Sequence, residues 1–125
     1  MTPPDNEIWY TTDTQTAFYT PLQEYFDAAI VSNTYNDGIG VIKFSTALTE
    51  IYDGTYNRAP FYNSVAGIPQ LTSVLFPSKL NRIGKYAFEG QNKISKILIP
   101  SSLSQIGLYA LYVNPTEIIY TGTKD

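Results

Sequence analysis

Residues 71–93 and 94–116 carry the same residue types in the same order, at a spacing of 23. The string LTSVLFPSKLNRIGKYAFEG lies over ISKILIPSSLSQIGLYALYV without a gap. A period of this length is typical of a solenoid, in which each repeat is one coil that buries its apolar edge against a neighbouring coil. The aligned pairs include Val74 with Ile97, Phe76 with Ile99, Pro77 with Pro100, Ile83 with Ile106, and Gly84 with Gly107.

Each copy begins with apolar residues at its first, fourth and sixth positions. In a short strand this pattern turns the apolar side chains into a core. Pro77 and Pro100 then end the strands, because proline has no N–H to donate to a sheet. A second apolar set, centred on Ile83 in the first copy, returns to the core from the opposite wall. Gly84 and Gly107 are expected at a turn, either with positive φ or where two backbones approach closely.

The repeat extends beyond these two copies. FSTALTEI at 44–51 aligns with FPSKLNRI at 76–83 at an offset of 32, which predicts a longer coil with its extra residues in a loop at 52–70. Tyr120 aligns with Ile97, which predicts a final strand. The predicted organisation is one structural domain with an N-terminal β-rich cap (1–40), an expanded first repeat with the loop insertion (41–70), two 23-residue repeats (71–116) and a terminal strand (117–125).

Residues 1–40 are predicted to form β-hairpins. EIWYTT (7–12) and TAFYT (16–20) flank a polar turn, and AIVSNTY and IGVIKF flank Asn36-Asp37-Gly38, where Asp-Gly is a strong turn signal. A helical turn is expected around 22–28. Because the open edge of a terminal coil has to be covered, we expect this segment to cap the solenoid.

The string PSKLNRIGKYAFEG, with the strand before it, resembles the BspA-type leucine-rich repeat of bacterial surface proteins, notably of gut and oral Bacteroidetes. The segments NEIWYTT, NTYNDGIGVIKF and EIIYTGTKD resemble the flanks of such repeats, so the resemblance covers nearly the whole chain. The position after the AFEG glycine, often Cys in the family, is Gln91 here. Repeat and resemblance together predict a mainly β fold with short helical turns, built as a leucine-rich-repeat solenoid of about three coils with an N-terminal β-hairpin cap.

The resemblance also implies a cell-surface or secreted protein that adheres to host matrix proteins or other cells. MTPPDNEIWY has neither the basic nor the apolar region of a signal peptide. Either an export signal has been removed or the protein is not exported by that route, and the resemblance favours the first. No apolar run approaches the roughly 20 residues of a membrane span, so we expect no membrane insertion.

The chain has no His and no Cys, which removes the commonest general base, the common nucleophilic dyads and most zinc sites. The oxygen ligands around the turn at 33–37 do not have EF-hand spacing, and no GxGxxG nucleotide motif is present. The family offers no catalytic residues to transfer. We therefore predict no catalytic residue, no metal and no cofactor.

Charge is distributed unevenly along the chain. Residues 1–70 have a balance of −6, and residues 71–116 have a balance of +4, which predicts that the two halves attract one another. Lys79, Arg82 and Lys85 follow at steps of three and form either a phosphate-binding stripe or solvated positions of an outer wall. Since no aromatic RNA-binding motif accompanies them and the chain is acidic overall, we favour the second and expect no nucleic-acid partner.

Strand parity predicts one binding surface. If Leu71, Val74 and Phe76 point inward, Leu75 and Leu98 point outward, where a solvated sheet should be polar. Either another part of the chain covers them or they form a patch for a partner. The predicted outward column contains Leu75, Leu98, Lys43 and Thr121, with Val41, Ser73, Lys96 and Ile119 beside it.

The insertion predicts a second surface. Eleven tyrosines are present, and Tyr52, Tyr56 and Tyr62 lie in the insertion, where a rigid ring with a polar tip suits protein or sugar recognition. Phe61 is expected to take the core role of Phe88.

These features lead to two hypotheses. The first is a non-catalytic recognition or adhesion module that binds a protein or a glycan. The alternative is a structural spacer or capping module of a larger surface or phage-like protein, with no ligand of its own. An enzyme ranks far behind both. The predicted partner-binding residues are Leu75, Leu98, Lys43, Lys96, Tyr52, Tyr56 and Tyr62.

Overall fold

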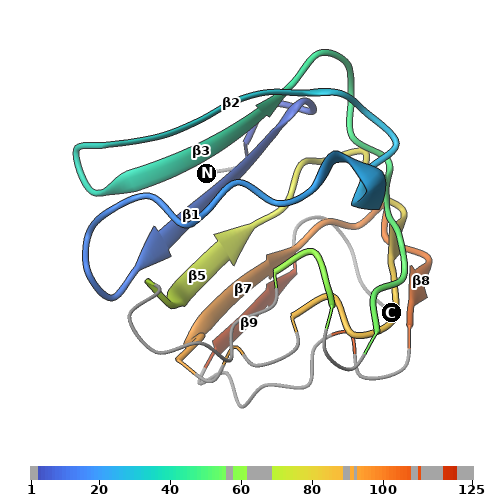
Figure 1. Cartoon of the computed structure of the whole chain (residues 1–125). Coiled ribbons are helices and arrows are strands. Elements are labelled where there is room, and N and C mark those ends of the chain that lie inside the picture. The colour runs from blue at the N-terminus through green and yellow to red at the C-terminus, as the bar shows by residue number, and fades with distance from the viewer. Residues whose placement is uncertain are drawn as a thin grey trace.

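The computed structural model describes residues 3–55, 58–61, 69–88, 91, 93–107 and 110, and the backbone of 117–120. This part of the chain is mainly β, as predicted, and its helical content is one short 3-10 turn, η1 (Gln23–Tyr25). The strands form a six-stranded sheet in the order β2-β3-β1-β5-β7-β9 (Figure 1). A three-stranded sheet has the order β4-β6-β8. The strands are β1 (Glu7–Thr12), β2 (Ile30–Asn36), β3 (Ile39–Phe44), β4 (Glu50–Ile51), β5 (Leu71–Leu75), β6 (Arg82–Ile83), β7 (Lys96–Ile99), β8 (Gln105–Ile106) and β9 (Glu117–Tyr120).

Parallel strands follow the sequence repeat in both sheets. In the large sheet, β5 and β7 pair Val74 with Ile97, at the spacing of 23 seen in the sequence. In the small sheet, Ile83 pairs with Ile51 on one side and with Ile106 on the other, so the offsets of 32 and 23 both hold. The predicted register of the last strand is wrong by two residues, because Ile97 pairs with Ile118 and Tyr120 pairs with Ile99.

The other half of the large sheet is antiparallel. β1 pairs with both β3 and β5, so that Trp9 lies opposite Val41 on one side and Leu75 on the other. The expectation that residues 41–44 lie directly beside β5 is therefore wrong, because β1 lies between them. The hairpin of β2 and β3 is confirmed, and Asp37 and Gly38 both adopt the positive φ (52° and 80°) that a two-residue hairpin turn requires.

Residues 16–20, predicted as a strand, form none. Side chains bind the backbone of this segment instead. The Tyr10 hydroxyl accepts the Phe18 N–H (3.1 Å), and the Asn33 amide donates to the Phe18 carbonyl (2.7 Å). The Thr12 hydroxyl accepts from the Thr16 N–H (3.1 Å) and donates to the Thr16 carbonyl (2.6 Å). Because side chains satisfy these backbone groups, the segment needs no partner strand.

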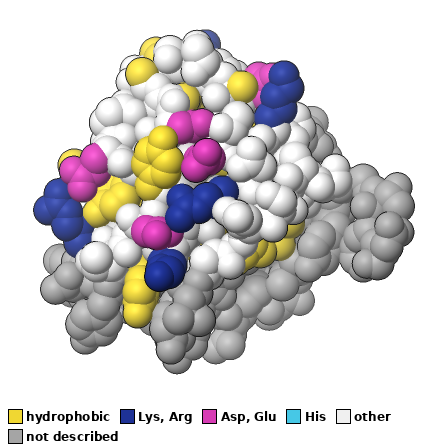
Figure 2. Space-filling model, turned by 90° about the vertical axis from the view of Figure 1, so that its right-hand side faces the viewer, with side chains coloured by type: hydrophobic (Ala, Val, Ile, Leu, Met, Phe, Trp, Pro, Cys, Tyr) yellow, Lys and Arg dark blue, Asp and Glu magenta, His cyan; other side chains and the backbone are white. Residues whose placement is uncertain are grey.

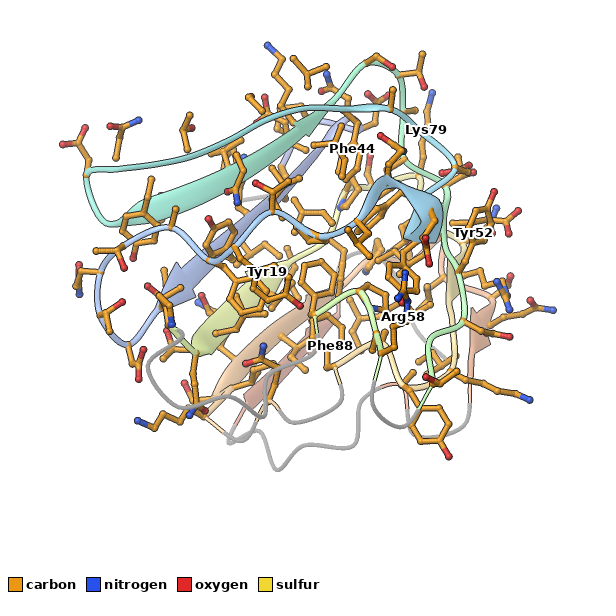
Figure 3. All side chains as sticks on the ribbon, viewed as in Figure 1. Tyr19, Phe44, Tyr52, Arg58, Lys79 and Phe88 are labelled. Carbon is orange, nitrogen blue, oxygen red and sulfur yellow. The ribbon has the colours of Figure 1, made fainter. Side chains whose placement is uncertain are left out.

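The core lies between the two sheets and contains a cluster of phenylalanines (Figure 3). Phe61 stacks on Phe88 with ring centroids 4.8 Å apart, and Phe76 meets Phe88 edge-on at 5.9 Å. Phe61 thus has the predicted core position. Ile106 does not, because it is 50% exposed, whereas Ile51 and Ile83 in the same row are fully buried. β8 is the last strand of the small sheet in the described part of the chain, so no further strand covers Ile106 there.

Gly84 and Gly107 lie where successive repeats pass closest to one another. Their N–H groups donate to the carbonyls of Ile51 and Ile83, both at 2.8 Å. A Cβ at Gly84 would overlap the backbone of Tyr52, and a Cβ at Gly107 would overlap the backbone that follows Gly84. Neither glycine has positive φ, so close backbone approach is the reason for glycine at these positions.

Gln91 is a buried polar residue whose side chain joins two distant segments. Its Oε1 accepts the Leu71 N–H (3.0 Å), and its Nε2 donates to the Phe61 carbonyl (2.8 Å). The side chain therefore binds the chain on both sides of residues 62–70. A cysteine at this position would be too short and too weak a hydrogen-bonding group to make both contacts.

Replacing Ile97 tests the core. Ile97 is almost fully buried in β7, and Ile97→Asp would bury an unpaired carboxylate at a cost of several kcal/mol, comparable with the roughly 5–15 kcal/mol that stabilise a whole domain. We expect this variant to lose its cooperative unfolding transition in urea. The matched control is Lys96→Asp, one residue earlier and exposed, which should unfold nearly as the wild type does. An unchanged midpoint for Ile97→Asp would contradict the inward orientation of residue 97.

Replacing Gln91 tests the buried link. Gln91→Leu keeps a side chain of similar size but leaves the Leu71 N–H and the Phe61 carbonyl without their partner, at about 1–3 kcal/mol for each buried group. We expect a lower free energy of unfolding by about 2 kcal/mol or more. The exposed Gln105 provides the control, since Gln105→Leu should change the free energy little. Equal urea midpoints for the two variants would show that the link adds no stability.

Candidate functional site

The candidate site is the face of the large sheet that is turned away from the core, here called the outer sheet face. On β1 the buried side chains Ile8 and Tyr10 alternate with Glu7, Trp9 and Thr11, which are only half-buried. This alternation places Trp9 on the outer face. Val41, Trp9, Leu75 and Leu98 lie directly opposite one another in adjacent strands and are called the apolar row.

The members of the apolar row differ in exposure. Val41, Trp9 and Leu75 are half-buried, so part of each side chain is available for contact. Leu98 is only 5% exposed, although it lies on the same face as Leu75. Of the two predicted leucines, Leu75 thus offers a contact surface and Leu98 does not.

The predicted lysines lie on the same face but not where the sequence placed them. Lys43 is opposite Glu7, across β1 from β5, so it does not stand beside Leu75 as expected. Lys96 is exposed and pairs with Ser73, in the row next to the leucines, as the parity argument proposed. Leu98 pairs with Ile119 rather than with Thr121, which is outside the described residues.

Trp9 is the residue that sequence reasoning missed. Its indole Nε1 donates a hydrogen bond of 2.8 Å to Oε1 of Glu7, which lies two residues earlier on the same face. The alternation within EIWYTT, with Ile8 and Tyr10 as inward residues, was the signal that could have placed it outward. The sequence predicts a cap for this segment, whereas the structure has it in the large sheet next to the repeats.

Hydroxyl groups line the other side of the apolar row. The Thr11 hydroxyl lies 2.6 Å from the Thr72 hydroxyl and 2.6 Å from the Ser73 hydroxyl. These contacts join β1 to the beginning of β5, where the register of the two strands shifts by one residue. The outer sheet face thus has an apolar row with Glu7 and Lys43 on one side, and with the hydroxyls and Lys96 on the other.

Tyr52 lies on a different part of the molecule. It follows β4 in the small sheet, is 37% exposed, and lies at the edge of the molecule in Figure 3. The predicted residues that the structure describes therefore lie on two separate surfaces. Tyr56 and Tyr62 are outside the described residues, so their predicted roles remain predictions.

Acidic and basic side chains lie next to one another on the side of the small sheet (Figure 2). Lys79 pairs with Asp5 at 3.5 Å, and Arg82 pairs with Asp53 at 2.7 Å and with Glu50 at 4.0 Å. Each of these pairs joins an acidic residue of the N-terminal half to a basic residue of the repeats, as the charge distribution predicted. Acidic partners thus neutralise two of the three cations in the predicted stripe.

Buried and paired ionisable groups near the site have structural roles. Burial raises the pKa of the Tyr10 phenol, whose hydroxyl donates to Asn33 (2.6 Å). The Gln70 N–H, and then Lys93, lower the pKa of the Asp13 carboxyl. Within the described residues, no three His, Cys, Asp or Glu side chains converge on a point where a metal could bind. No helix in the same part of the chain is long and apolar enough to span a membrane.

Parallel strands that repeat every 23 residues, with apolar and glycine positions in common, are features of a leucine-rich repeat protein. The family model described as BspA type Leucine rich repeat region (6 copies) matches residues 61–123. The chain therefore belongs to the BspA-type leucine-rich repeat family, as its sequence indicated. This family is generally non-catalytic and typically surface-associated. Comparisons with curated proteins and with solved structures find no match.

Asp13 provides a prediction about pH. A lowered pKa in the folded state means that the contribution of Asp13 to stability is fully present above its ordinary value of 3.8 and is lost as the pH falls through the lowered value. Asp13→Asn can still accept from the Gln70 N–H but has no charge for Lys93. We expect the difference in free energy of unfolding between the two proteins to be constant near neutral pH and to shrink below about pH 4. A difference that persists unchanged in acid would contradict a charge-dependent role.

Proposed function

We propose that this chain is a non-catalytic recognition module of a cell-surface or secreted protein, and that it binds a protein or a glycan through its outer sheet face. The observation that carries the proposal is the apolar row, in which Trp9 and Leu75 leave apolar surface available on a sheet face that would otherwise be polar. Trp is among the residues most enriched at the centre of binding sites.

The proposed framework is a solenoid of about three coils whose N-terminal end is capped. The parallel registers in both sheets support the coils. Each 23-residue repeat contributes one parallel strand to each sheet, and the expanded first repeat contributes β4 to the small sheet. Residues near the N-terminal end support the cap. Phe26 bridges to Ile51, Tyr52 donates its N–H to the Tyr25 carbonyl, and the Asp27 carboxylate accepts the N–H groups of Thr49 and Glu50. These contacts satisfy backbone groups at the outer edge of β4. In a longer solenoid, the strand of a preceding coil would pair with that edge.

A location outside the cell is part of the proposal. It rests on the family, which is typically surface-associated. The absence of cysteine is compatible with a location inside or outside the cell. Outside the cell, the buried phenylalanine core supplies the stability that small secreted domains often obtain from disulfides.

The test is a binding screen of the whole chain against host matrix proteins and an array of glycans. If the outer sheet face is the site, Leu75→Ser should weaken binding at least about tenfold, or about 1.4 kcal/mol, because it removes contact area without adding charge. Tyr52→Ala alters the other surface and should leave the affinity unchanged.

Each outcome of this screen has a distinct meaning. Loss of binding with Tyr52→Ala alone would move the site to the small-sheet side. A folded chain that binds nothing in either panel would contradict the recognition hypothesis and favour the spacer. Thermal unfolding of both variants, monitored by circular dichroism, has to show a native transition before the affinities are compared.

A further inference from the structure

The structure points to a narrower ligand class, and we propose that the outer sheet face binds a neutral pyranose sugar stacked on the indole of Trp9. This inference rests on the proposed function and specifies its ligand. Three features support it: the hydrogen-bonded indole, the polar groups on either side of it and the small size of the apolar row.

The indole of Trp9 is held in place before any ligand arrives. Its single hydrogen-bond donor is already occupied by Glu7, at 2.8 Å, so the part of the ring that remains for contact is its π face and edge. An aromatic ring that is fixed in this way loses little conformational freedom on binding. A flat apolar surface without an unsatisfied donor suits the C–H face of a pyranose ring.

Hydrogen-bonding groups are present on both sides of this platform. Toward the beginning of β1 lie the Glu7 carboxylate and, directly opposite in β3, Lys43. Two residues further along β1 is Thr11, which is opposite Ser73. Residues two apart on a strand are roughly 7 Å apart, so a ring over Trp9 has an acceptor and a donor near one end and hydroxyls near the other. Sugar hydroxyls both donate and accept, and such a mixed set matches them.

The charges around the platform favour an uncharged ligand. Glu7 and Lys43 are opposite in sign and lie opposite one another in adjacent strands, so their charges balance beside Trp9. The other exposed cation of this face, Lys96, is one strand further away, in β7. A uronate or a sulfated sugar is repelled by Glu7 and attracted by Lys43, so it gains no net attraction there, and it loses hydration of its charge when it stacks on the indole.

The size of the apolar row argues against a protein as the ligand at this place. A stable protein interface buries roughly 800 Å² on each partner around a well-packed apolar centre. Among the described residues Val41, Trp9 and Leu75 contribute, each half-buried, and Leu98 is already covered. Ile39 of β3 is also exposed on this face, two residues before Val41. Charged groups lie in the next row on one side, and hydroxyls lie in the next row on the other. The available apolar area suits one or two sugar rings.

The test uses Trp9 itself as the reporter, because it is the only tryptophan in the chain. Neutral oligosaccharides of glucose, mannose, galactose and xylose are titrated into the whole chain, beside an oligosaccharide of uronic acid, and tryptophan fluorescence is recorded. We expect at least one neutral sugar to shift or quench the emission saturably, and the uronate to bind more weakly than that sugar.

Variants then locate the site by calorimetry with the sugar that binds best. Trp9→Ala should weaken binding at least about tenfold, or about 1.4 kcal/mol. Ser73→Ala is a milder change that keeps the sheet intact, and it should weaken binding several-fold through the lost hydroxyl. Tyr52→Ala, on the other surface, should bind as the wild type does. Unfolding midpoints show whether the variants are folded.

Several results would overturn the inference. These are a preferred uronate, fluorescence of Trp9 that does not respond to any neutral sugar, or a sugar affinity that Trp9→Ala leaves unchanged. If no sugar binds but a matrix protein does, and Leu75→Ser abolishes that binding, the sugar inference fails and the proposed recognition function stands. If neither kind of ligand binds, both fail.

Discussion

The antiparallel pairing of β1 with β5 joins the N-terminal third of the chain to the repeats. It sets Tyr10 against Val74 on the inner side and Trp9 against Leu75 on the outer side. Because side chains alternate between the faces of a sheet, a slip of one residue in this register would turn Trp9 into the core and expose Tyr10. The core, the position of residues 16–20 and the outer sheet face therefore all depend on this one register.

Long-range contacts from the N-terminal half reinforce that register. Tyr10 and Asn33 together bind Phe18, and Phe18 is buried as a result. Asp5 and Asp13 reach Lys79 and Lys93 in the repeats. Exposed ion pairs contribute at most about 1 kcal/mol each, so burial of the aromatic core provides most of the stability and the charges favour the correct docking of the two halves.

The parts of the fold that the sequence predicts are those in which structure repeats with the chain. The offsets of 23 and 32 appear in the registers because equivalent buried side chains, such as Val74 with Ile97 and Ile51 with Ile83, occupy equivalent places. The position of β1 could not be predicted in this way, since its partners are distant in sequence and its alternation suits several neighbours. Residues 16–20 have strand-forming side chains, but hydrogen bonds from distant side chains replaced the expected ladder. For the same reason parity predicts an outward Leu75, whereas the alternation in EIWYTT can turn Trp9 outward but cannot place it beside Leu75.

Inward and outward positions of the large sheet meet different requirements. The inward positions must recur in each repeat, because each one fills the same core. The outward positions are free of that requirement, and the most distinctive of them, Trp9, comes from a strand that is not part of the repeat. A further parallel strand beside β9 would lengthen the sheet without altering the surroundings of Trp9. Three strands, β5, β7 and β9, would separate that strand from β1. Any specificity located there belongs to the junction between the N-terminal strands and the first parallel strand, and the repeats serve as the rigid support that holds Leu75 against it.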